Sequence, residues 1–499
     1  MGINRFERPY TTVHLPCQYG GCTAQYCQTF ILEDLLRCCP GIQSIYILLR
    51  QKKNISPDSR KEPLFKKKIF SKIKEENPEV LNKVFVVAGD ISLPNLGLNK
   101  EDELRIIEEV SIIFHCAASI SFFKPARYLV SQNVLSTKCM ITLCRQLKKL
   151  DVFVYTSTAF CNSNHRTMET MPEEVLRLPF PVQKFIDALK NETENTFEEL
   201  VAECKPDWPN WYSFSKVMAE NLIVETASDL PVAIVRPSVV FCSWKTPLRG
   251  YVEGQFGITA LVCGGAQGFI KVYFGDPDIQ LNIIPVDVVA NAHLIVAWSV
   301  GTSRAPTPFI VNCVSNENLN PRAREILDCI MELSNRYPAP RTFQMTTWAA
   351  FIRNPTIYWL LSVYEHYVPA YFFDFTRKIS GKKPRMVDLY RYIDKIEDSL
   401  YHFTTNEFKY DCSNMLYLNR LLHPDDKKVL DVDSKELTFR DLMMSLPEAA
   451  PFYDWKEDKK SPQSRLKFSK QVYWMIQVIK GSFLMICFML VYWIFSFVL

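Results

Sequence analysis

The sequence predicts an α/β chain with a doubly wound parallel sheet, followed by a smaller, mainly helical domain and a carboxyl-terminal transmembrane helix. Three observations predict it: apolar β-like runs alternate with helical stretches over the first three hundred residues, aromatic-rich helical patterns follow, and the last eighteen residues carry no charge. We expect a nucleotide-binding domain at 10–305, a second domain at 306–453, a basic linker at 454–471 and the membrane helix at 472–499.

Composition excludes several classes of protein. The chain has 499 residues, 48% hydrophobic and 22% charged, which allows two or three domains and excludes a disordered chain. Its net charge of +4 is too small for a nucleic-acid-binding protein. Sixteen cysteines in so long a chain are too sparse for a disulfide scaffold, and no CxxC pair or HExxH motif indicates a metal site. We therefore predict a body in a reducing compartment, with neither metal nor nucleic acid.

The expected strands are short apolar runs bounded by polar residues, and helical patterns separate them. The first run, Thr12–Cys17, is weakened by Pro16. The helical patterns with the clearest spacing lie at 30–38 and 128–150. The other expected strands are Ile45–Leu49, Val84–Ala88, Ile112–His115, Val152–Tyr155 and Val232–Val235. Such a sheet binds its ligand at the carboxyl ends of the strands.

The second domain contains an aromatic-rich stretch, Met345–Phe375, that is interrupted by Arg353, Pro355 and Glu365. These interruptions argue against a membrane span. The stretch fits the cover of an apolar pocket or a segment lying on a membrane surface, and ordinary core packing explains it equally well.

The tail, Ser482–Leu499, is uncharged and about 27 Å long as a helix, slightly short of a hydrocarbon core. Extending it back to Val472 gives a sufficient length if Lys480 snorkels to the interface. Basic residues precede it, and the amino terminus shows no secretory signal. We expect a tail anchor with the body in the cytosol. A hydrophobic helix buried in the core or in a dimer interface is the alternative.

The pattern that points most clearly to chemistry is Tyr212 and Lys216, four residues apart and so on one face of a helix. A lysine ammonium there lowers the pKa of the phenol, which then exchanges a proton near neutral pH. Ser157 and Thr158 follow one predicted strand and supply hydroxyls for a developing oxyanion. Arg236 and its neighbours follow another strand. Together these groups suit hydride transfer to a carbonyl.

On these residues the chain resembles the extended short-chain dehydrogenases, with their Rossmann domain, and within them the fatty acyl-CoA reductases, as a divergent insect-type member. The resemblance covers roughly Ile31 to Asp454 and includes the segment FHCAASISF at 114–122. It extends to the second domain, at 390–408 and 422–426. A small departure there is Phe439, where the family usually carries tryptophan.

The resemblance implies reduction of a long-chain or very-long-chain acyl-CoA to a primary alcohol with two NADPH. Tyr212 would protonate the oxyanion, and Lys216 would lower its pKa and bind the nicotinamide ribose. Thr158, with Ser157, would orient the thioester carbonyl. Asn133 matches the helix asparagine that holds a water or backbone group.

The resemblance also implies cofactor contacts and a location. Arg50, at the end of the second strand, would pair with the 2′-phosphate of NADPH, whereas an acid there would favour NAD. Asp90 matches an adenine contact. The remaining implied cofactor contacts are Cys116, Ala117, Ala118 and Pro237. The expected partners are the acyl-CoA and a membrane, peroxisomal or of the endoplasmic reticulum.

The chain departs from the family in its phosphate-binding loop, where the family has Gly-x-x-Gly-x-x-Gly. Counting back from Pro40 places Cys22, Gln25 and Gln28 at the three glycine positions, and no other register restores the motif. The glycines that remain, Gly20 and Gly21, are the expected loop contacts. Two explanations stay open: weak cofactor binding, or a misassigned exon that encodes the first thirty residues.

Two other functions are compatible with these motifs. The first is a catalytically silent relative that binds a lipid or a protein partner, which the lost glycines favour. The second is a different extended dehydrogenase, acting on a sterol or sugar nucleotide, against which the second domain argues. The acyl chain length and the oligomeric state are not encoded in any motif that we recognise.

Overall fold

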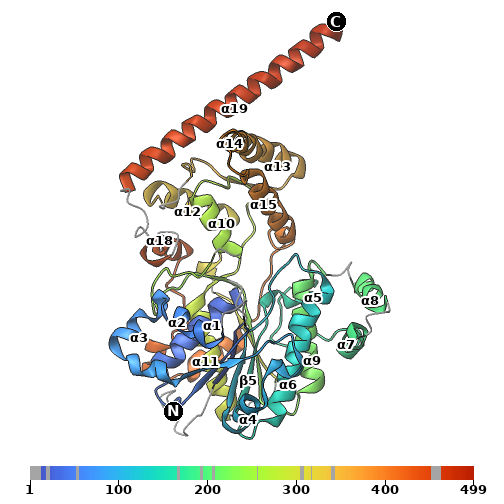
Figure 1. Cartoon of the computed structure of the whole chain (residues 1–499), viewed down its shortest axis with the longest axis vertical. Helices are drawn as coiled ribbons and strands as arrows, with labels where there is room; N and C mark the ends of the chain where they lie inside the picture. Colours follow the sequence, from blue (N-terminus) through green and yellow to red (C-terminus); the bar gives the residue numbers. More distant parts are fainter. Residues whose placement is uncertain are drawn as a thin grey trace. The chain divides into compact units, whose positions relative to one another are not determined.

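The chain, shown as a computed structural model in Figure 1, packs into two compact units. The structure describes residues 13–17, 23–51, 56–165, 169–190, 195–204, 208–254, 257–303, 308–315, 317–338, 343–450 and 462–498. The first unit comprises 1–254, 282–319 and 408–438, and the second comprises 255–281, 320–407 and 439–499. Each unit is thus built from three segments of the chain. The domain boundary expected between residues 305 and 306 stays a prediction.

The first unit contains a seven-stranded parallel sheet in the order β10-β6-β5-β4-β1-β2-β3. This is a Rossmann-like sheet, and the order reverses between β1 and β4, where doubly wound sheets bind nucleotides. Its strands are β1 (Val13–Cys17), β2 (Ile45–Leu49), β3 (Val84–Ala88), β4 (Ile112–His115), β5 (Val152–Thr156), β6 (Val232–Pro237) and β10 (Phe309–Cys313).

The apolar runs that predicted strands are strands because helices cover both faces of the sheet. All residues of β2, β4, β5 and β6 are buried, whereas the edge strand β3 is partly exposed. Pro16 lies inside β1, a central strand. β1 pairs with β2 over five residues, Pro16 included, but with β4 only at Val13 and His14, so Pro16 lies beyond the shorter ladder.

Helices from different parts of the chain cover the two faces of this sheet. α1 (Thr23–Cys38) packs on α11 (Val286–Ser303) on one face, and α6 (Ser136–Gln146) packs on α9 (Trp211–Thr226) on the other, as Figure 1 shows. The other helices of this unit are α2 (Lys61–Phe65), α3 (Ser71–Glu76), α4 (Lys100–Glu109), α5 (Ala126–Val130), α7 (Val182–Lys190), α8 (Thr196–Cys204), α16 (Ser413–Leu421) and α17 (Pro424–Val429). A two-stranded ladder joins β7 (Val239–Phe241) to β9 (Ile283–Pro285).

The predicted helix over 128–150 contains one irregular turn. Between α5 and α6 the chain forms a turn of π-helix, η6 (Ser131–Leu135), and Asn133 lies in it. Such turns are frequent at functional sites, because the extra residue changes the direction in which a side chain points.

The second unit is mainly helical. Its helices are α10 (Gly257–Ala266), α12 (Ala323–Arg336), α13 (Pro355–Ser362), α14 (Val368–Ile379), α15 (Met386–Leu400), α18 (Phe439–Ala449) and α19 (Pro462–Val498). A second π-turn, η10 (Val363–Tyr367), joins α13 to α14. One short ladder pairs β8 (Val272–Phe274) with β11 (Ala350–Ile352).

Of the helices that the structure describes, one is long and apolar enough to cross a membrane, at Gln463–Ser496 with a mean hydropathy of 2.0. This helix, α19, begins at Pro462 and so includes the last part of the predicted linker. Its two halves differ. Ser469, Val472, Ile476 and Lys480 are buried on one stripe, whereas the side chains from Phe483 to Phe495 are mostly exposed.

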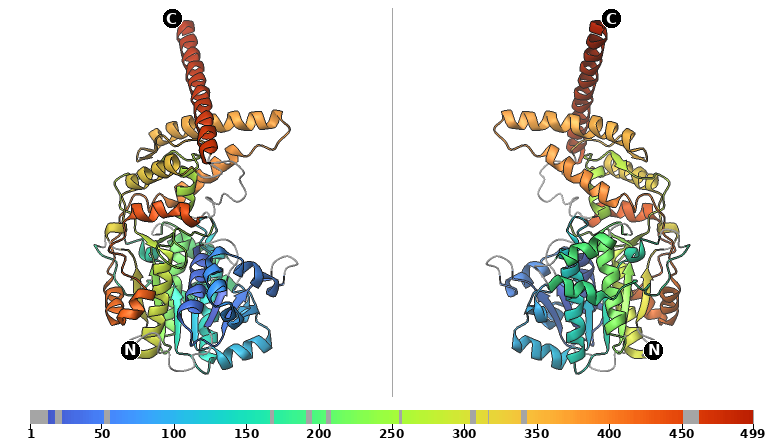
Figure 2. Two further views of the ribbon diagram at one scale, coloured as in Figure 1. Left: turned by 90° about the vertical axis from the view of Figure 1, so that its left-hand side faces the viewer. Right: turned by 90° about the vertical axis from the view of Figure 1, so that its right-hand side faces the viewer.

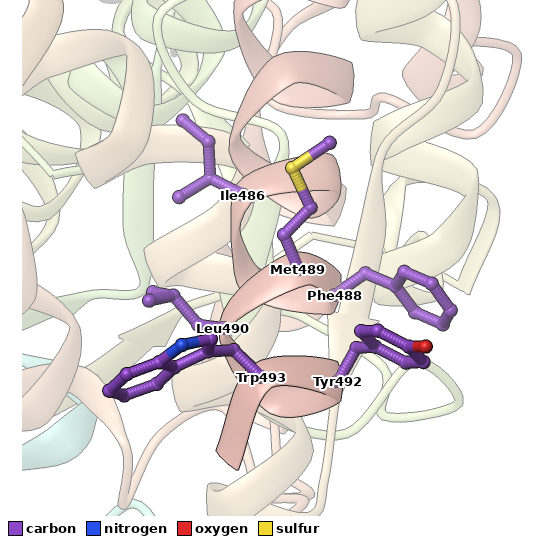
Figure 3. Close-up of a pocket in the computed structure, with 6 residues that line it drawn as sticks. All are labelled: Ile486, Phe488, Met489, Leu490, Tyr492 and Trp493. Carbon is purple, nitrogen blue, oxygen red and sulfur yellow. The ribbon is translucent and has the colours of Figure 1, made fainter. Parts of the chain in front are cut away.

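The expectation that Lys480 snorkels to the interface is wrong. Lys480 is buried, and its ammonium donates a hydrogen bond of 2.6 Å to Glu365, which lies in η10. The amino-terminal half of α19 is therefore part of the second unit. Figure 3 shows six side chains of the outer half that point away from the helix: Ile486, Phe488, Met489, Leu490, Tyr492 and Trp493. The hollow between them is shallow and is lined by residues of α19 alone.

Candidate active site

The candidate site begins with α9, which carries the predicted tyrosine–lysine pair. The side chain of Asn210 caps this helix by accepting a hydrogen bond of 2.8 Å from the backbone N–H of Ser213. Tyr212 and Lys216 are one turn apart on the helix, as their spacing predicted. Eleven consecutive residues, 213–223, are buried, so α9 is a core helix whose amino-terminal turn carries polar groups.

Lys216 is buried and its ammonium is held at the carboxyl end of β5. It donates a hydrogen bond of 2.7 Å to the backbone oxygen of Thr156 and lies 3.3 Å from the phenol oxygen of Tyr155. The ammonium also lies 4.8 Å from the centre of the Tyr155 ring, within cation–π range. The positive charge is therefore fixed in position by β5.

Tyr212 is partly buried at the start of α9. Its ring meets that of Phe122 edge to face, with the ring centres 5.6 Å apart. Its backbone oxygen accepts a hydrogen bond of 2.8 Å from the hydroxyl of Ser215. The contact with Phe122 restricts the ring of Tyr212, and the hydrogen bond from Ser215 fixes its backbone in the first turn of α9.

Asn133 links three elements of the site. Its amide oxygen accepts a hydrogen bond of 2.8 Å from the backbone N–H of Ser119, and its amide nitrogen donates to the backbone oxygen of Ser119 at 3.0 Å. The same nitrogen donates to the hydroxyl of Ser215 at 2.8 Å. The side chains of Asn133 and Ser215 thus tie the backbone of Ser119, in the loop after β4, to α9.

Ser157 and Thr158 follow β5, as the sequence predicted. The Thr158 hydroxyl caps a short 3₁₀ turn, η7 (Ala159–Asn162), by accepting a hydrogen bond from the N–H of Phe160 at 3.3 Å, and η7 packs on α9. The Ser157 hydroxyl is buried and makes no hydrogen bond to any described residue. A buried hydroxyl without a partner is costly, so it fits a site that a bound molecule completes.

The loop after β4 has small side chains, because Cys116, Ala117 and Ala118 are all buried there. The thiol of Cys116 accepts a hydrogen bond of 3.1 Å from the Thr156 hydroxyl, and burial raises its pKa to about 11. Thr156 also lies 2.8 Å from Nε2 of His293, whose pKa burial lowers to about 4. These groups are neutral at pH 7, so this part of the site carries no charge.

Arg50 and Asp90 lie side by side at the ends of β2 and β3. Their Nε and Oδ2 atoms are 3.7 Å apart, and the Arg50 side chain is 47% exposed. Asp90 accepts hydrogen bonds from the N–H and the hydroxyl of Ser92, at 2.9 and 2.7 Å. At this distance and exposure the ion pair is weak, so Arg50 is available for a ligand anion.

Pro237 ends β6, opposite Cys313 of β10, and it follows a fully buried arginine. Arg236 donates two hydrogen bonds to Glu220 of α9, at 2.9 and 2.6 Å. It donates two more to the backbone oxygens of Pro172 and Glu174, at 3.0 and 2.8 Å. This pair fixes α9 against β6, one turn beyond Lys216.

Most of the expected phosphate-binding loop lies outside the described residues. Gly20, Gly21 and Cys22 belong there. Gln25 lies in the first turn of α1, and Gln28 is buried in its second turn. In this register the position of the third family glycine is therefore a buried helix interior and not part of the turn.

Three residues that contact the predicted site residues or fix their helix were not expected from the sequence: Tyr155, Ser215 and Glu220. Tyr155 ends a predicted strand, where a buried aromatic is ordinary core, and Ser215 and Glu220 lie in the helix of Tyr212 and Lys216 without a motif of their own. A signal did exist for Glu220, since a carboxylate one turn after a buried lysine on an apolar helix requires a cationic partner.

The described residues fit a dinucleotide cofactor. The carboxyl ends of β4 and β5 carry small side chains, the fixed ammonium of Lys216 and the unpartnered Ser157 hydroxyl, which suit a nicotinamide ribose and a reacting carbonyl. Arg50 and Asp90 suit the adenosine end.

Comparison with known proteins is consistent with this arrangement. Residues 28–293 match the NAD-binding family described as "Male sterility protein", and residues 365–453 match a second family, Sterile, with the same description. The chain is 31% identical over 409 residues to human "Fatty acyl-CoA reductase 1", covering 82% of this chain and 78% of that protein.

Another relative is "Fatty acyl-CoA reductase wat" of Drosophila melanogaster, 31% identical over 445 residues, covering 88% of this chain and 84% of that protein. Among solved structures, the terminal R domain of the myxalamid PKS-NRPS pathway has a TM-score of 0.56 at 19% identity, covering 88% of this chain and 89% of that domain. That likeness shows the fold alone.

Proposed function

The chain belongs to the fatty acyl-CoA reductase family, and on that basis we propose that it reduces a long-chain or very-long-chain fatty acyl-CoA to a primary alcohol with two NADPH. The observation that carries the proposal is the pair Tyr212 and Lys216 on one turn of α9, with the Lys216 ammonium held at the end of β5. A positioned phenol beside a fixed cation is what protonation of a carbonyl oxygen requires.

The substrate oxygen is handled by Ser157, Thr158 and Tyr212 in this mechanism. The hydroxyls of Ser157 and Thr158 donate hydrogen bonds to the thioester oxygen as it gains negative charge. Tyr212 gives its phenol proton to that oxygen, and the charge of Lys216 favours the phenolate left behind. NADPH, when bound, supplies the hydride for each of the two reductions.

The product of the first reduction is a hemithioacetal. Its C–S bond breaks, its hydroxyl proton ends on the sulfur, and the CoA thiol leaves an aldehyde in the site. Tyr212, reprotonated, acts a second time on the aldehyde oxygen. The sum is one thioester, two hydrides and two protons converted to one primary alcohol and CoA thiol.

The groups that would hold NADPH are Lys216 at the nicotinamide ribose, Arg50 at the 2′-phosphate and Asp90 at the adenosine, with the small residues Cys116–Ala118 beside the nicotinamide. Support for the 2′-phosphate comes from the exposed guanidinium of Arg50, which ends the strand where an acid would select NAD. The C-terminal helix α19 would anchor the enzyme in a peroxisomal or endoplasmic-reticulum membrane with the body in the cytosol.

The test replaces Tyr212 by Phe. Tyr212→Phe removes only the proton donor, so we expect alcohol formation to fall about 10²–10⁴-fold, the contribution of general acid catalysis. Fatty alcohols in cells that express the chain are measured by mass spectrometry, and circular dichroism checks folding. Tyr128→Phe, at an exposed tyrosine of the same unit, is the control. Unchanged alcohol output from folded Tyr212→Phe protein would contradict the assignment.

A second candidate is a silent family member that binds lipid or protein, and the glutamines in α1 favour it. Calorimetric titration with NADPH separates the two functions. Binding too weak to measure in the unmodified chain supports the silent protein, whereas micromolar or tighter binding supports the enzyme. Of the three family glycine positions, Gln25 and Gln28 lie in α1, where a glycine costs about 1 kcal/mol of helix stability, so the repair is confined to Cys22→Gly.

A further inference from the structure

The helices α13 and α14, joined by η10, carry a large apolar face on the surface of the second unit. Trp359 is 62% exposed, Phe375 63% and Ile379 72%. Among the described residues the other exposed apolar side chains of these helices are Ile357, Leu360, Tyr371 and Phe372. An exposed helix face in water is normally polar, so an aromatic face of this size indicates an apolar environment.

The exposure of this face does not mean that the helices lack packing. The opposite side of the same helices is buried in the second unit, with Ser362, His366, Ala370 and Asp374 all shielded from solvent. Polar groups thus lie on the buried side and large apolar groups on the open side, the reverse of a helix at a protein–water boundary. No charge occurs between Arg353 and Glu365.

The apolar face lies beside the point at which α19 becomes exposed. α14 packs on α19, and the carboxylate of Glu365 in η10 accepts a hydrogen bond of 2.6 Å from the ammonium of Lys480. The continuous exposed apolar run of α19 begins three residues after Lys480, at Phe483, and single exposed side chains such as Trp474 and Val478 precede it. In Figure 2, α13, η10 and α14 form one long helix, coloured orange, that crosses the lower part of the red α19. These helices therefore lie at the level where a spanning α19 would enter a membrane.

The last turn of α14 and the segment after it are basic. Lys378, Lys382, Lys383 and Arg385 are exposed, and no acidic residue occurs from 375 to 387. Asp374 holds this segment in place, because its carboxylate accepts hydrogen bonds from the backbone N–H groups of Arg385, Met386 and Val387 at 2.8 to 3.0 Å. A fixed cluster of cations next to an apolar face complements anionic lipid headgroups.

We propose that α13, η10 and α14 form an in-plane membrane-binding surface, inserted among the headgroups of an anionic bilayer beside the spanning α19. The proposal rests on the membrane anchorage proposed above. It makes the second unit a body that lies on the bilayer, with Trp359 and Phe375 at the depth where aromatic side chains are enriched.

The experiment places a photocrosslinking phenylalanine analogue at one position of the full-length chain. The protein is reconstituted in vesicles of phosphatidylcholine and phosphatidylserine, four to one, with radiolabelled lipid. Probes at 359 and 375 test the surface. A probe at 104 is the control, since Leu104 in α4 is 62% exposed, as Trp359 is. A probe at 488 reports on α19 itself.

We expect lipid adducts at 359 and 375 to exceed those at 104 by about tenfold, as for interfacial aromatic residues. The triple change Lys378→Glu, Lys382→Glu, Lys383→Glu should lower the yield several-fold in mixed vesicles and leave it unchanged in pure phosphatidylcholine. Adducts at 488 without adducts at 359 and 375 would overturn the proposal and leave the anchor standing. Absence of adducts at 488 would overturn the anchorage, and crosslinks to a second protein chain would show that this face binds a copy of the chain.

Discussion

Both units bury charged side chains, but they balance them differently. In the first unit Arg236 and Glu220 form a one-to-one pair in which the guanidinium also donates to two backbone oxygens. In the second unit two lysines share the single carboxylate of Glu365. Lys480 is 2.6 Å from it, whereas Lys271 is 3.7 Å away and makes no hydrogen bond to any described residue through its ammonium.

The surroundings of the two clusters shift the pKa of the buried cation in opposite directions. Arg236 is paired so fully that its pKa is raised despite burial. The pKa of Lys271 is lowered to about 8, first by burial and further by Lys480, although Glu365 opposes both. The first cluster is therefore a fixed structural link next to the candidate active site, whereas the second holds one positive charge more than its carboxylate balances.

The largest effect is expected from removing the carboxylate of the balanced pair. Glu220→Gln leaves Arg236 buried and charged, and arginine cannot release its proton, so the free energy of unfolding should fall by about 3–5 kcal/mol. Urea unfolding in detergent, followed by circular dichroism, measures it. Asp229→Asn, which breaks an exposed pair with Arg145, is the control and should cost about 0–1 kcal/mol. Equal losses in both variants would show that the buried pair has no special role.

Variants of the cluster of Lys271, Glu365 and Lys480 should lose less stability, and the loss should depend on which residue is changed. Glu365→Gln leaves two buried lysines, but a lysine escapes the penalty by losing a proton, so we expect a loss of roughly 1–3 kcal/mol. Lys480→Met leaves Glu365 with Lys271 and should cost less. The midpoint of thermal unfolding for both variants, in the same detergent, tests the order. A larger loss for Lys480→Met would mean that the tail contact, not the charge balance, dominates.

Stability should also depend on pH through Lys271. Its folded pKa of about 8 lies below the unfolded value near 10.5, so between these values the unfolded chain binds more protons. The free energy of unfolding therefore rises with pH across this window, by at most about 1.4 kcal/mol per pH unit. It is measured at pH 8, 9 and 10 as the difference between the unmodified chain and Lys271→Met. A difference that does not change with pH would refute the shifted titration.

The smallest effect concerns the link between the fixed charge and the site. Tyr155→Phe removes the hydroxyl 3.3 Å from the Lys216 ammonium and keeps the ring and the Thr156 contact. We expect a loss of about 1 kcal/mol, which is about fivefold in NADPH affinity, with kcat little changed. Fluorescence titration with NADPH and steady-state kinetics separate the two. A fall in kcat without a change in affinity would place Tyr155 in the chemical step instead.

The fold was predictable where local pattern decides it. The runs at 45–49, 84–88 and 112–115 are strands at the expected bounds, because strands buried on both faces of a parallel sheet are continuous apolar runs. The three-residue strands β7, β8, β9 and β11 were not expected, since so short a segment carries no period. The first helix begins at Thr23, seven residues earlier than its apolar spacing indicated.

The site was predictable in part for the same reason. The spacing of Tyr212 and Lys216 sets their common face within one helix turn, whereas the partners of Lys216 come from a strand some sixty residues away. Glu365 and Lys480 are 115 residues apart, and neither residue carries a local sign of the other. The roles predicted for Ser157, Thr158, Asn133 and the cofactor contacts stay predictions that the proposed experiments test.

The two π-turns impose a constraint on how such a chain changes over time. Each holds one more residue than an ideal helical turn, and each carries a side chain on which distant contacts depend, Asn133 in η6 and Glu365 in η10. One residue turns a helix by about 100°. Because the wide turn absorbs this extra residue, losing one residue from η10 would leave an ordinary α-helical turn, with α13 and α14 presenting nearly the same faces but Glu365 displaced from Lys480. At these two places the chain can therefore lose one residue without turning the following helix over, whereas the same loss in the middle of α14 would turn every later side chain by about 100°.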